Sequence, residues 1–179
     1  MNKEEKQIAS KRVYQGRILD LFVDDVICPN GIESKREFVS HRGGAAILAI
    51  DKDENAYFVR QFRYPYREEL LEIPAGKIEK DENPINTAKR ELTEETGLIS
   101  DDLEEYGVLY PTPGYTNEKL YVYKTVADEI GQTHLDSDEF IDVCKINIEK
   151  AFDMVVSGVI KDAKTVYAIS RYIAEKYRK

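Results

Sequence analysis

Three glutamates, Glu91, Glu94 and Glu95, stand close together along the chain. If this segment is helical, their side chains fall within an arc of about 100° on one face of the helix. Carboxylates this close repel one another unless cations lie among them. Because the only histidines are His41 and His134, a metal site here must be built from oxygen ligands, which favours Mg²⁺ or Mn²⁺ over zinc. The spacing therefore predicts metal-assisted chemistry on an anionic substrate.

The element that must position these glutamates is a helix with recognisable ends. Asn83 suits the N-cap, Pro84 the first helical position and Gly97 the residue after the last turn. Arg90 lies outside the carboxylate arc, where it can pair with Glu82 and hold the preceding loop. The adjoining apolar stripe consists of Ile85, Ala88 and Leu92. Most charge runs are solvated helix faces, but here the acidic face has no basic residue of its own, which favours a metal site.

Residues 76–98, GKIEKDENPINTAKRELTEETGL, resemble the Nudix signature at every defining position. Gly76 is followed after five residues by Glu82, and after seven more by the run from Arg90 to Leu98. At ordinary residue frequencies of ~5–10%, a chance match to the seven strictly defined positions is on the order of 10⁻⁸. The segment is therefore identified as a Nudix motif.

The resemblance implies a role for each acidic residue of the motif. Glu91 and Glu95 would be the main metal ligands, and Glu94 would assist directly or through water. Glu82 joins the candidate catalytic set, and the carbonyl group of Ala75 would complete a metal site. The implied reaction is hydrolysis of a pyrophosphate linkage with Mg²⁺, or alternatively Mn²⁺, as the cofactor.

Beyond the motif, the chain resembles the ADP-ribose pyrophosphatase branch of the Nudix family over almost its whole length. The segments that carry this resemblance are YQG at 14–16, VRQFRYP at 59–65, EIPAG at 72–76 and TPGYTNE at 112–118. Pro113 stands sixteen residues beyond Gly97, the offset associated with ADP-ribose preference. The branch implies a small nucleotide-sugar substrate, ADP-ribose, with AMP and ribose 5-phosphate as products.

The same resemblance implies a set of substrate contacts, with Arg63 on a phosphate and the pair Arg36–Glu37 reaching the substrate from the N-terminal domain. The full set is Ile18, Arg36, Glu37, Arg63, Pro113, Gly114 and Glu118. Taken alone, Arg63 equally fits a strand-edge arginine, and Pro113–Gly114 fits an ordinary turn. Some relatives stack the adenine on an aromatic ring just after YQG, whereas Ile18 offers only aliphatic contact.

An acidic segment, HLDSDEF at 134–140, holds the candidate for the base that activates water. Relatives often carry two glutamates separated by one residue in this segment. At the corresponding two positions this chain has Ser137 and Glu139, so only the second glutamate is kept. Glu139 is therefore the candidate general base or additional metal ligand, with Asp136 or Asp138 as possible substitutes. The alternative is an acidic surface loop without a catalytic role.

The composition limits the function classes further. The 179 residues suffice for one domain with a small appendage, and 42% of them are hydrophobic, enough for a packed core. A net charge of −8 argues against a nucleic-acid partner, and no apolar run approaches the ~20 residues needed to span a membrane. The charged N-terminus lacks a signal-peptide pattern, and only Cys28 and Cys144 occur, so we expect a cytoplasmic protein.

Strand-like runs interleaved with three helix-like patterns predict an α/β (α+β) class with a mixed sheet, preceded by a small antiparallel β domain. The resemblance implies that this fold is a Nudix-type α/β/α sandwich. We expect residues 1–40 to form this appendage, with Pro29-Asn30-Gly31 as its turn, and residues 41–179 to form the catalytic domain. The appendage is too small to be stable alone. It is similar to one that relatives exchange across a homodimer, which implies a dimer here.

Two function classes follow from these features. The first is an enzyme that cleaves ADP-ribose, or another nucleoside diphosphate sugar or dinucleotide. The second is a binding module that senses ADP-ribose without cutting it. Such modules typically lose acidic residues of the motif, whereas this chain retains Glu82, Glu91, Glu94 and Glu95. The sequence favours the enzyme.

Overall fold

The computed structural model describes residues 2–126, 129–130 and 140–178, and the chain divides into two compact units. The first unit contains Met1–Gly43 and Tyr110–Lys119, and the second contains Gly44–Leu109 and Leu120–Lys179. The segment 1–40, expected as an appendage, lies within the first unit. The addition of residues 110–119 to this unit was not anticipated, because these residues are far from it along the chain.

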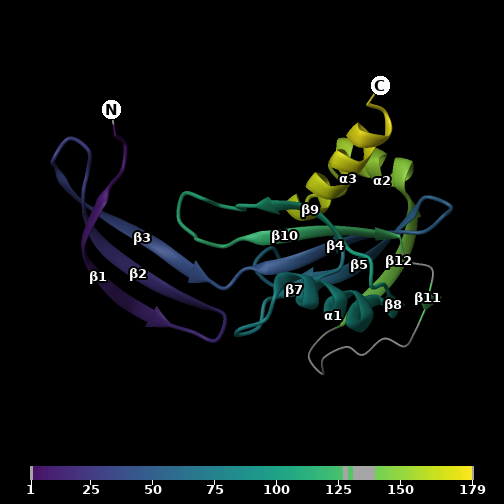
Figure 1. Cartoon of the computed structure of the whole chain (residues 1–179), viewed down its shortest axis with the longest axis horizontal. Coiled ribbons are helices and arrows are strands. Elements are labelled where there is room, and N and C mark those ends of the chain that lie inside the picture. The colour runs from purple at the N-terminus through teal and green to yellow at the C-terminus, as the bar shows by residue number, and fades with distance from the viewer. Residues whose placement is uncertain (1, 127–128, 131–139, 179) are drawn as a thin grey trace. The chain divides into compact units, whose positions relative to one another are not determined.

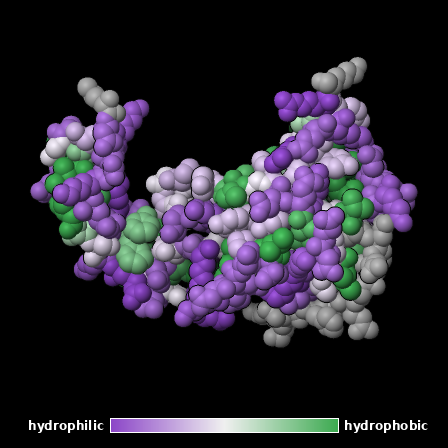
Figure 2. All heavy atoms as spheres, viewed as in Figure 1, coloured by the Kyte–Doolittle hydropathy of each residue, from purple (hydrophilic) through white to green (hydrophobic). Residues whose placement is uncertain are grey.

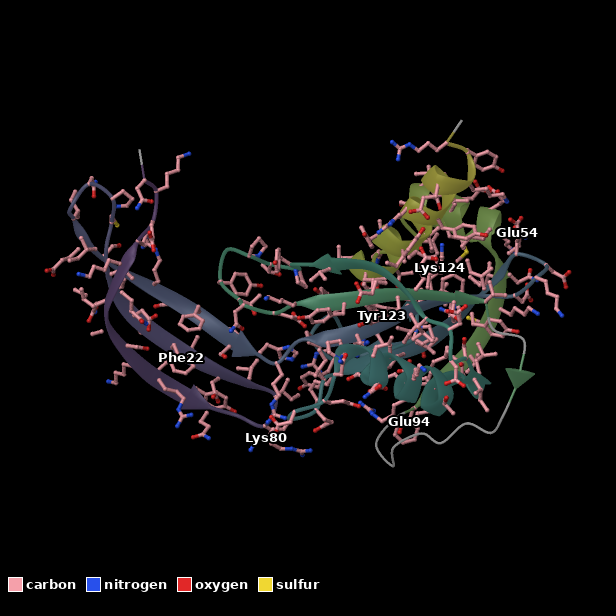
Figure 3. The ribbon with its side chains drawn as sticks, in the orientation of Figure 1. Phe22, Glu54, Lys80, Glu94, Tyr123 and Lys124 are labelled. Carbon is pink, nitrogen blue, oxygen red and sulfur yellow. The ribbon has the colours of Figure 1, made fainter. Side chains whose placement is uncertain are left out.

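The first unit contains a three-stranded antiparallel sheet of β1 (Lys6–Gln15), β2 (Leu19–Ile27) and β3 (Glu33–His41), in that order. The predicted turn between β2 and β3 is present: the backbone N–H of Gly31 donates to Cys28 O at 2.8 Å, and Gly31 has φ +84°. The rings of Phe22 and Phe38 stack with centroids 5.1 Å apart. Phe22 extends from this sheet in Figure 3. β1 begins within the charged N-terminal stretch, earlier than its composition suggests.

The second unit is built on a seven-stranded mixed sheet with the order β12-β5-β4-β10-β9, in which β6 also pairs with β5 and β7 with β4. β10 runs parallel to β4, and the other pairings are antiparallel. The strands are β4 (Gly44–Ile50), β5 (Asn55–Arg63), β6 (Glu68–Glu72), β7 (Ala75–Lys77), β9 (Glu104–Leu109), β10 (Leu120–Val126) and β12 (Ile141–Asn147). A separate short pair joins β8 (Leu98–Ile99) to β11 (Glu129–Ile130).

Helices cover both faces of this sheet (Figure 1). α1 (Pro84–Thr96) packs on one face, and α2 (Ile148–Val156) and α3 (Ala163–Lys176) pack on the other. All residues of β4 are buried, and they alternate between the two layers, since successive strand residues point to opposite faces. Ala46, Leu48 and Ile50 join the α2–α3 core, whereas Ala45, Ile47 and Ala49 join the α1 core. The predicted α/β/α sandwich with a mixed sheet is confirmed.

One strand of the second unit is not signalled by its local sequence. The stretch from Pro65 reads as irregular, yet Glu68–Glu72 forms β6, which pairs with β5 from Val59 to Arg63. The hydrogen-bonded pairing with β5 stabilises Glu68–Glu72 as a strand, although the local composition of this segment does not indicate one.

The surface in the view of Figure 2 is largely hydrophilic, with hydrophobic residues scattered over it. Among the described residues, no helix is both long enough and apolar enough to cross a membrane.

Candidate active site

The helix that carries the glutamates forms as its sequence predicts. The side chain of Asn83 caps the N-terminus of α1 by accepting a hydrogen bond from Ile85 N at 3.2 Å, and Pro84 follows at the first position. At the other end, Gly97 adopts the left-handed conformation with φ 73°, and its N–H donates to Thr93 O at 2.9 Å. The apolar stripe is buried as expected: Ala88 and Leu92 are fully buried, and Ile85 packs against the same core.

Burial of this stripe places two of the three glutamates at the sheet. Glu91 is 7% exposed and Glu95 is 3% exposed, so both carboxylates lie in the interior. The backbone N–H of Ala75 donates to Glu95 Oε2 at 3.0 Å. Gly76 lies against Glu91, because a Cβ atom added at Gly76 would stand 1.8 Å from Glu91 Oε1. The segment Ala75–Gly76 therefore meets both buried carboxylates.

The third glutamate differs in its surroundings. The Glu94 side chain is partly exposed on α1 (Figure 3), and its Oε2 accepts a hydrogen bond from Arg90 Nη1 at 2.9 Å. The same Arg90 nitrogen donates to Glu91 Oε1 at 2.7 Å. The expectation that the acidic face lacks a basic residue was wrong. Arg90 reaches two of its carboxylates, because its long side chain curls back along the helix surface.

The predicted pair between Arg90 and Glu82 is confirmed. Arg90 Nε and Nη2 approach the Glu82 carboxylate oxygens at 3.3 Å each, and Nη2 also donates to Lys77 O at 3.3 Å. The hydrogen bonds from Arg90, opposed by burial and assisted by the backbone N–H of Glu79, lower the pKa of Glu82 to about 2. Glu82 is thus an anionic anchor that fixes Arg90 and the loop before α1.

These residues fit a hard divalent cation in the type of their donor atoms. Glu91, Glu94, Glu95 and the Ala75 carbonyl group supply oxygen only, as Mg²⁺ prefers. Gly76 allows the Glu91 carboxylate to occupy the position that a side-chain Cβ atom would take. In the described parts of the chain, no three acidic, histidine or cysteine side chains already converge on one point. Mg²⁺ ordinarily retains several water ligands, so it does not require such a closed set.

A second buried charge cluster lies beside the glutamates. Arg63 Nε and Nη2 donate to the two carboxylate oxygens of Glu72 at 2.6 Å each, and Lys164 Nζ also donates to Glu72 Oε2. Glu72 is 2% exposed. Burial raises its pKa, but the hydrogen bonds and charges of Arg63 and Lys164 outweigh that effect and lower the pKa to about 2. Glu72 therefore stays ionised at neutral pH and holds Arg63.

The sequence analysis gave no role to Glu72 and did not identify Lys164. One sequence signal for Lys164 exists: it stands in the first turn of α3, where the helix dipole disfavours a cation. A lysine at such a position indicates a specific acidic partner, but not which one.

The remaining predicted substrate residues belong to the first unit. Ile18, Arg36 and Glu37 are exposed, and Arg36 Nε donates to Glu5 Oε2 at 2.9 Å. Pro113 and Gly114 are exposed, and Glu118 lies 3.4 Å from His41 Nδ1. The predicted base Glu139 lies outside the described residues. The structure thus brings Ala75, Glu82, Glu91, Glu94, Glu95 and Arg63 into the second unit.

Comparisons with known proteins agree with this geometry. Residues 40–168 match the model of the NUDIX domain. The chain is 43% identical to an ADP-ribose pyrophosphatase of Bacillus subtilis, over 93% of this chain and 91% of that protein. It is 40% identical to a methanol dehydrogenase activator of Bacillus methanolicus, with the same coverage of both chains. An ADP-ribose pyrophosphatase of Mycobacterium tuberculosis is 37% identical over 74% of this chain and 65% of its own length. The chain therefore belongs to the Nudix family, and it is a Nudix pyrophosphohydrolase.

Proposed function

We propose that this pyrophosphohydrolase cleaves ADP-ribose to AMP and ribose 5-phosphate with Mg²⁺ as its cofactor. The observation that carries the proposal is the placement of Glu91 and Glu95, buried against the Ala75–Gly76 backbone. This arrangement occurs in a chain 43% identical to a relative named ADP-ribose pyrophosphatase. Another relative with the same name, 37% identical, supports the same substrate.

In the proposed reaction, a water oxygen forms a bond to one phosphorus of the pyrophosphate, and the bond from that phosphorus to the bridging oxygen breaks. Glu91, Glu95, Glu94 and the Ala75 carbonyl group would hold the metal ion. When bound, a divalent ion supplies charge neutralisation and a more acidic water. Arg63, held by Glu72, would bind a phosphate oxygen, and Glu139 would take the proton from the attacking water.

Substrate binding would also involve the first unit. We propose that Ile18, Arg36, Glu37, Pro113, Gly114 and Glu118 contact the substrate, with residues 1–40 exchanged between the subunits of a homodimer. The exposure of Ile8, Val13 and Tyr14 on β1 supports this, since a partner would cover apolar surface that the chain leaves open. Light scattering at micromolar concentration should give twice the mass of one chain. A particle with the mass of a single chain would exclude the dimer.

We further propose that the protein acts in the cytoplasm. Cys28 and Cys144 are both free thiols, as a reducing compartment maintains them.

The test of the substrate is a hydrolysis screen with Mg²⁺ over ADP-ribose, other nucleotide sugars, dinucleotides and nucleoside triphosphates. Products are identified by mass, in water enriched in ¹⁸O. We expect ADP-ribose to give the highest kcat/KM and to yield AMP and ribose 5-phosphate, one of which carries the label. A tenfold higher kcat/KM for another substrate would overturn the assignment. Tight binding of ADP-ribose without turnover would instead indicate a binding module.

A further inference from the structure

Four charged side chains lie together at the first turn of α3, away from the glutamates of α1 in sequence. Arg63 comes from β5, Glu72 from β6, and Asp162 and Lys164 from the N-terminus of α3. Lys164 Nζ donates to Glu72 Oε2, and it lies 3.0 Å from Asp162 Oδ1. The two positive and two negative charges of this cluster cancel. Such pairing is needed because a buried charge without a partner is energetically costly.

Arg63 is the member of this cluster that can meet a ligand. Its Nε and Nη2 are both used by Glu72, while Nη1 makes no hydrogen bond within the described residues. The side chain is 37% exposed, so part of it faces solvent, where a ligand could approach. Hydrogen bonds to Glu72 raise the pKa of Arg63 against the effect of burial, and the charges of Glu72, Asp162 and Glu95 raise it further. Arg63 therefore lies within electrostatic reach of Glu95.

Lys164 is the member that restrains this arrangement. It is 7% exposed, and its ammonium group shares Glu72 Oε2 with Arg63 Nη2. Without Lys164, this buried carboxylate oxygen would lose one of its two donors, and Asp162 would lose its cation. A buried carboxylate with fewer donors can rotate or admit water, and the guanidinium group bound to it would move as well.

The same turn of α3 also supports the backbone that leads to the glutamates. Thr165 Oγ1 accepts a hydrogen bond from Ile73 N at 2.8 Å and donates to Asp162 Oδ2 at 2.6 Å. Ile73 stands two residues before Ala75, whose N–H binds Glu95. α3 thus supports the region beside Glu95 both through Glu72 and through the backbone of Ile73.

We propose that Lys164 is a positioning residue for pyrophosphate hydrolysis, which acts through Glu72 to hold the Arg63 guanidinium group ready for a substrate phosphate. The substrate part of this inference rests on the proposed function, in which Arg63 contacts phosphate. The orientation of Arg63 itself is a property of the free protein and can be measured without substrate.

The experiment compares Lys164→Met with Lys161→Met, a matched control on the same segment. Lys161 is exposed, and within the described residues it pairs only with Glu68. The first readout is hydrogen exchange of the Arg63 Nε–H with solvent, followed by ¹⁵N NMR and assigned by its loss in Arg63→Lys. We expect about tenfold faster exchange in Lys164→Met, because the guanidinium group is released, and wild-type exchange in Lys161→Met. Exchange within twofold of wild type in Lys164→Met would overturn the proposal.

The second readout is the Kd for ADP-ribose, measured by calorimetry in EDTA. The proteins compared are wild type, the single variants Lys164→Met, Lys161→Met and Arg63→Gln, and the double variant Lys164→Met/Arg63→Gln. We expect Lys164→Met to weaken binding about tenfold, and to weaken it no further once Arg63 is already Gln. Full additivity would show that Lys164 does not act through Arg63. If wild type binds no ADP-ribose in EDTA, the exchange measurement alone decides the role of Lys164, and the hydrolysis screen with Mg²⁺ separately decides the substrate.

A folding defect would not prevent the test. If Lys164→Met does not fold, the double variant Lys164→Met/Asp162→Asn replaces it, because it also removes the anion that Lys164 balances, and asparagine can still cap α3. The same twofold exchange limit then applies.

Discussion

The backbone of Gly76 and the carboxylate of Glu91 are in direct contact. A methyl group added at Gly76 would lie 1.8 Å from Glu91 Oε1 and 1.9 Å from its carboxyl carbon. Any side chain at position 76 must therefore displace Glu91, the residue that we assign to the metal. The glycine of the motif is required here for the close approach of the backbone to this carboxylate.

Gly76→Ala should reduce kcat by about 10²-fold or more, because misplacement of a metal ligand by an ångström removes much of its effect. The obstacle is the end of a flexible side chain, so the protein should still fold. The measurement is kcat at saturating Mg²⁺ together with the thermal midpoint of unfolding. Wild-type kcat in a folded Gly76→Ala protein would contradict the assigned role of Glu91.

Glu91→Gln or Glu95→Gln should lower kcat by on the order of 10³, because metal activation contributes several kcal/mol to the rate. Both variants should fold, since glutamine still accepts the hydrogen bonds from Arg90 and Ala75, and one like charge leaves the acidic face. Glu105→Gln, an exposed position on β9, is the control and should retain wild-type kcat. Retention of a tenth of the wild-type kcat in either variant would argue against a ligand.

Glu72→Gln should lower the free energy of unfolding at pH 7 by about 3–5 kcal/mol, because it leaves buried Lys164 and half-buried Arg63 without their shared anion. The pKa of Glu72 is about 2 in the folded protein, below its ordinary value of 4.5. Its stabilising contribution is therefore complete above pH ~4.5 and is lost as the pH falls toward ~2.

Urea unfolding at several pH values checks this. The difference between wild type and Glu72→Gln should stay constant from pH 7 to about 5 and shrink below that, because Glu72 takes up its proton at a higher pH in the unfolded wild-type chain than in the folded protein. Glu68→Gln, on the same strand but in an exposed pair with Lys161, should stay within about 0.5 kcal/mol of wild type. A difference for Glu72→Gln that grows with acid would contradict the assigned pKa.

Glu139→Gln should reduce kcat by roughly 10²–10⁴ with little change in KM, if this residue is the general base. Added Mg²⁺ should not restore the rate, whereas it would partly restore the rate if Glu139 were a metal ligand. The measurement is kcat across a Mg²⁺ titration for Glu139→Gln and for Ser137→Glu. Wild-type turnover in Glu139→Gln would remove this residue from the mechanism. A higher rate in Ser137→Glu would place the base at position 137.

The sequence by itself determined the catalytic helix. Its cap at Asn83, its end at Gly97, its apolar stripe and the spacing of its glutamates all depend on interactions within a few residues of one another. The burial of β4 is equally local. Its sequence is apolar throughout, as a strand buried on both faces requires. These local rules sufficed for an α/β class with a mixed sheet, and the resemblance of the motif to the Nudix signature supplied the choice of Glu91 and Glu95 as ligand candidates.

Only the tertiary structure decided which charges meet. Glu72 and Lys164 are 92 residues apart, and Arg63 joins them because β5, β6 and the first turn of α3 pack together. The position of Arg90 over Glu91 and Glu94 likewise depends on a side-chain conformation that residue spacing does not specify. Pairings of this kind follow from long-range packing, in which burial compels each charge to find a partner, and no local pattern in the chain identifies that partner.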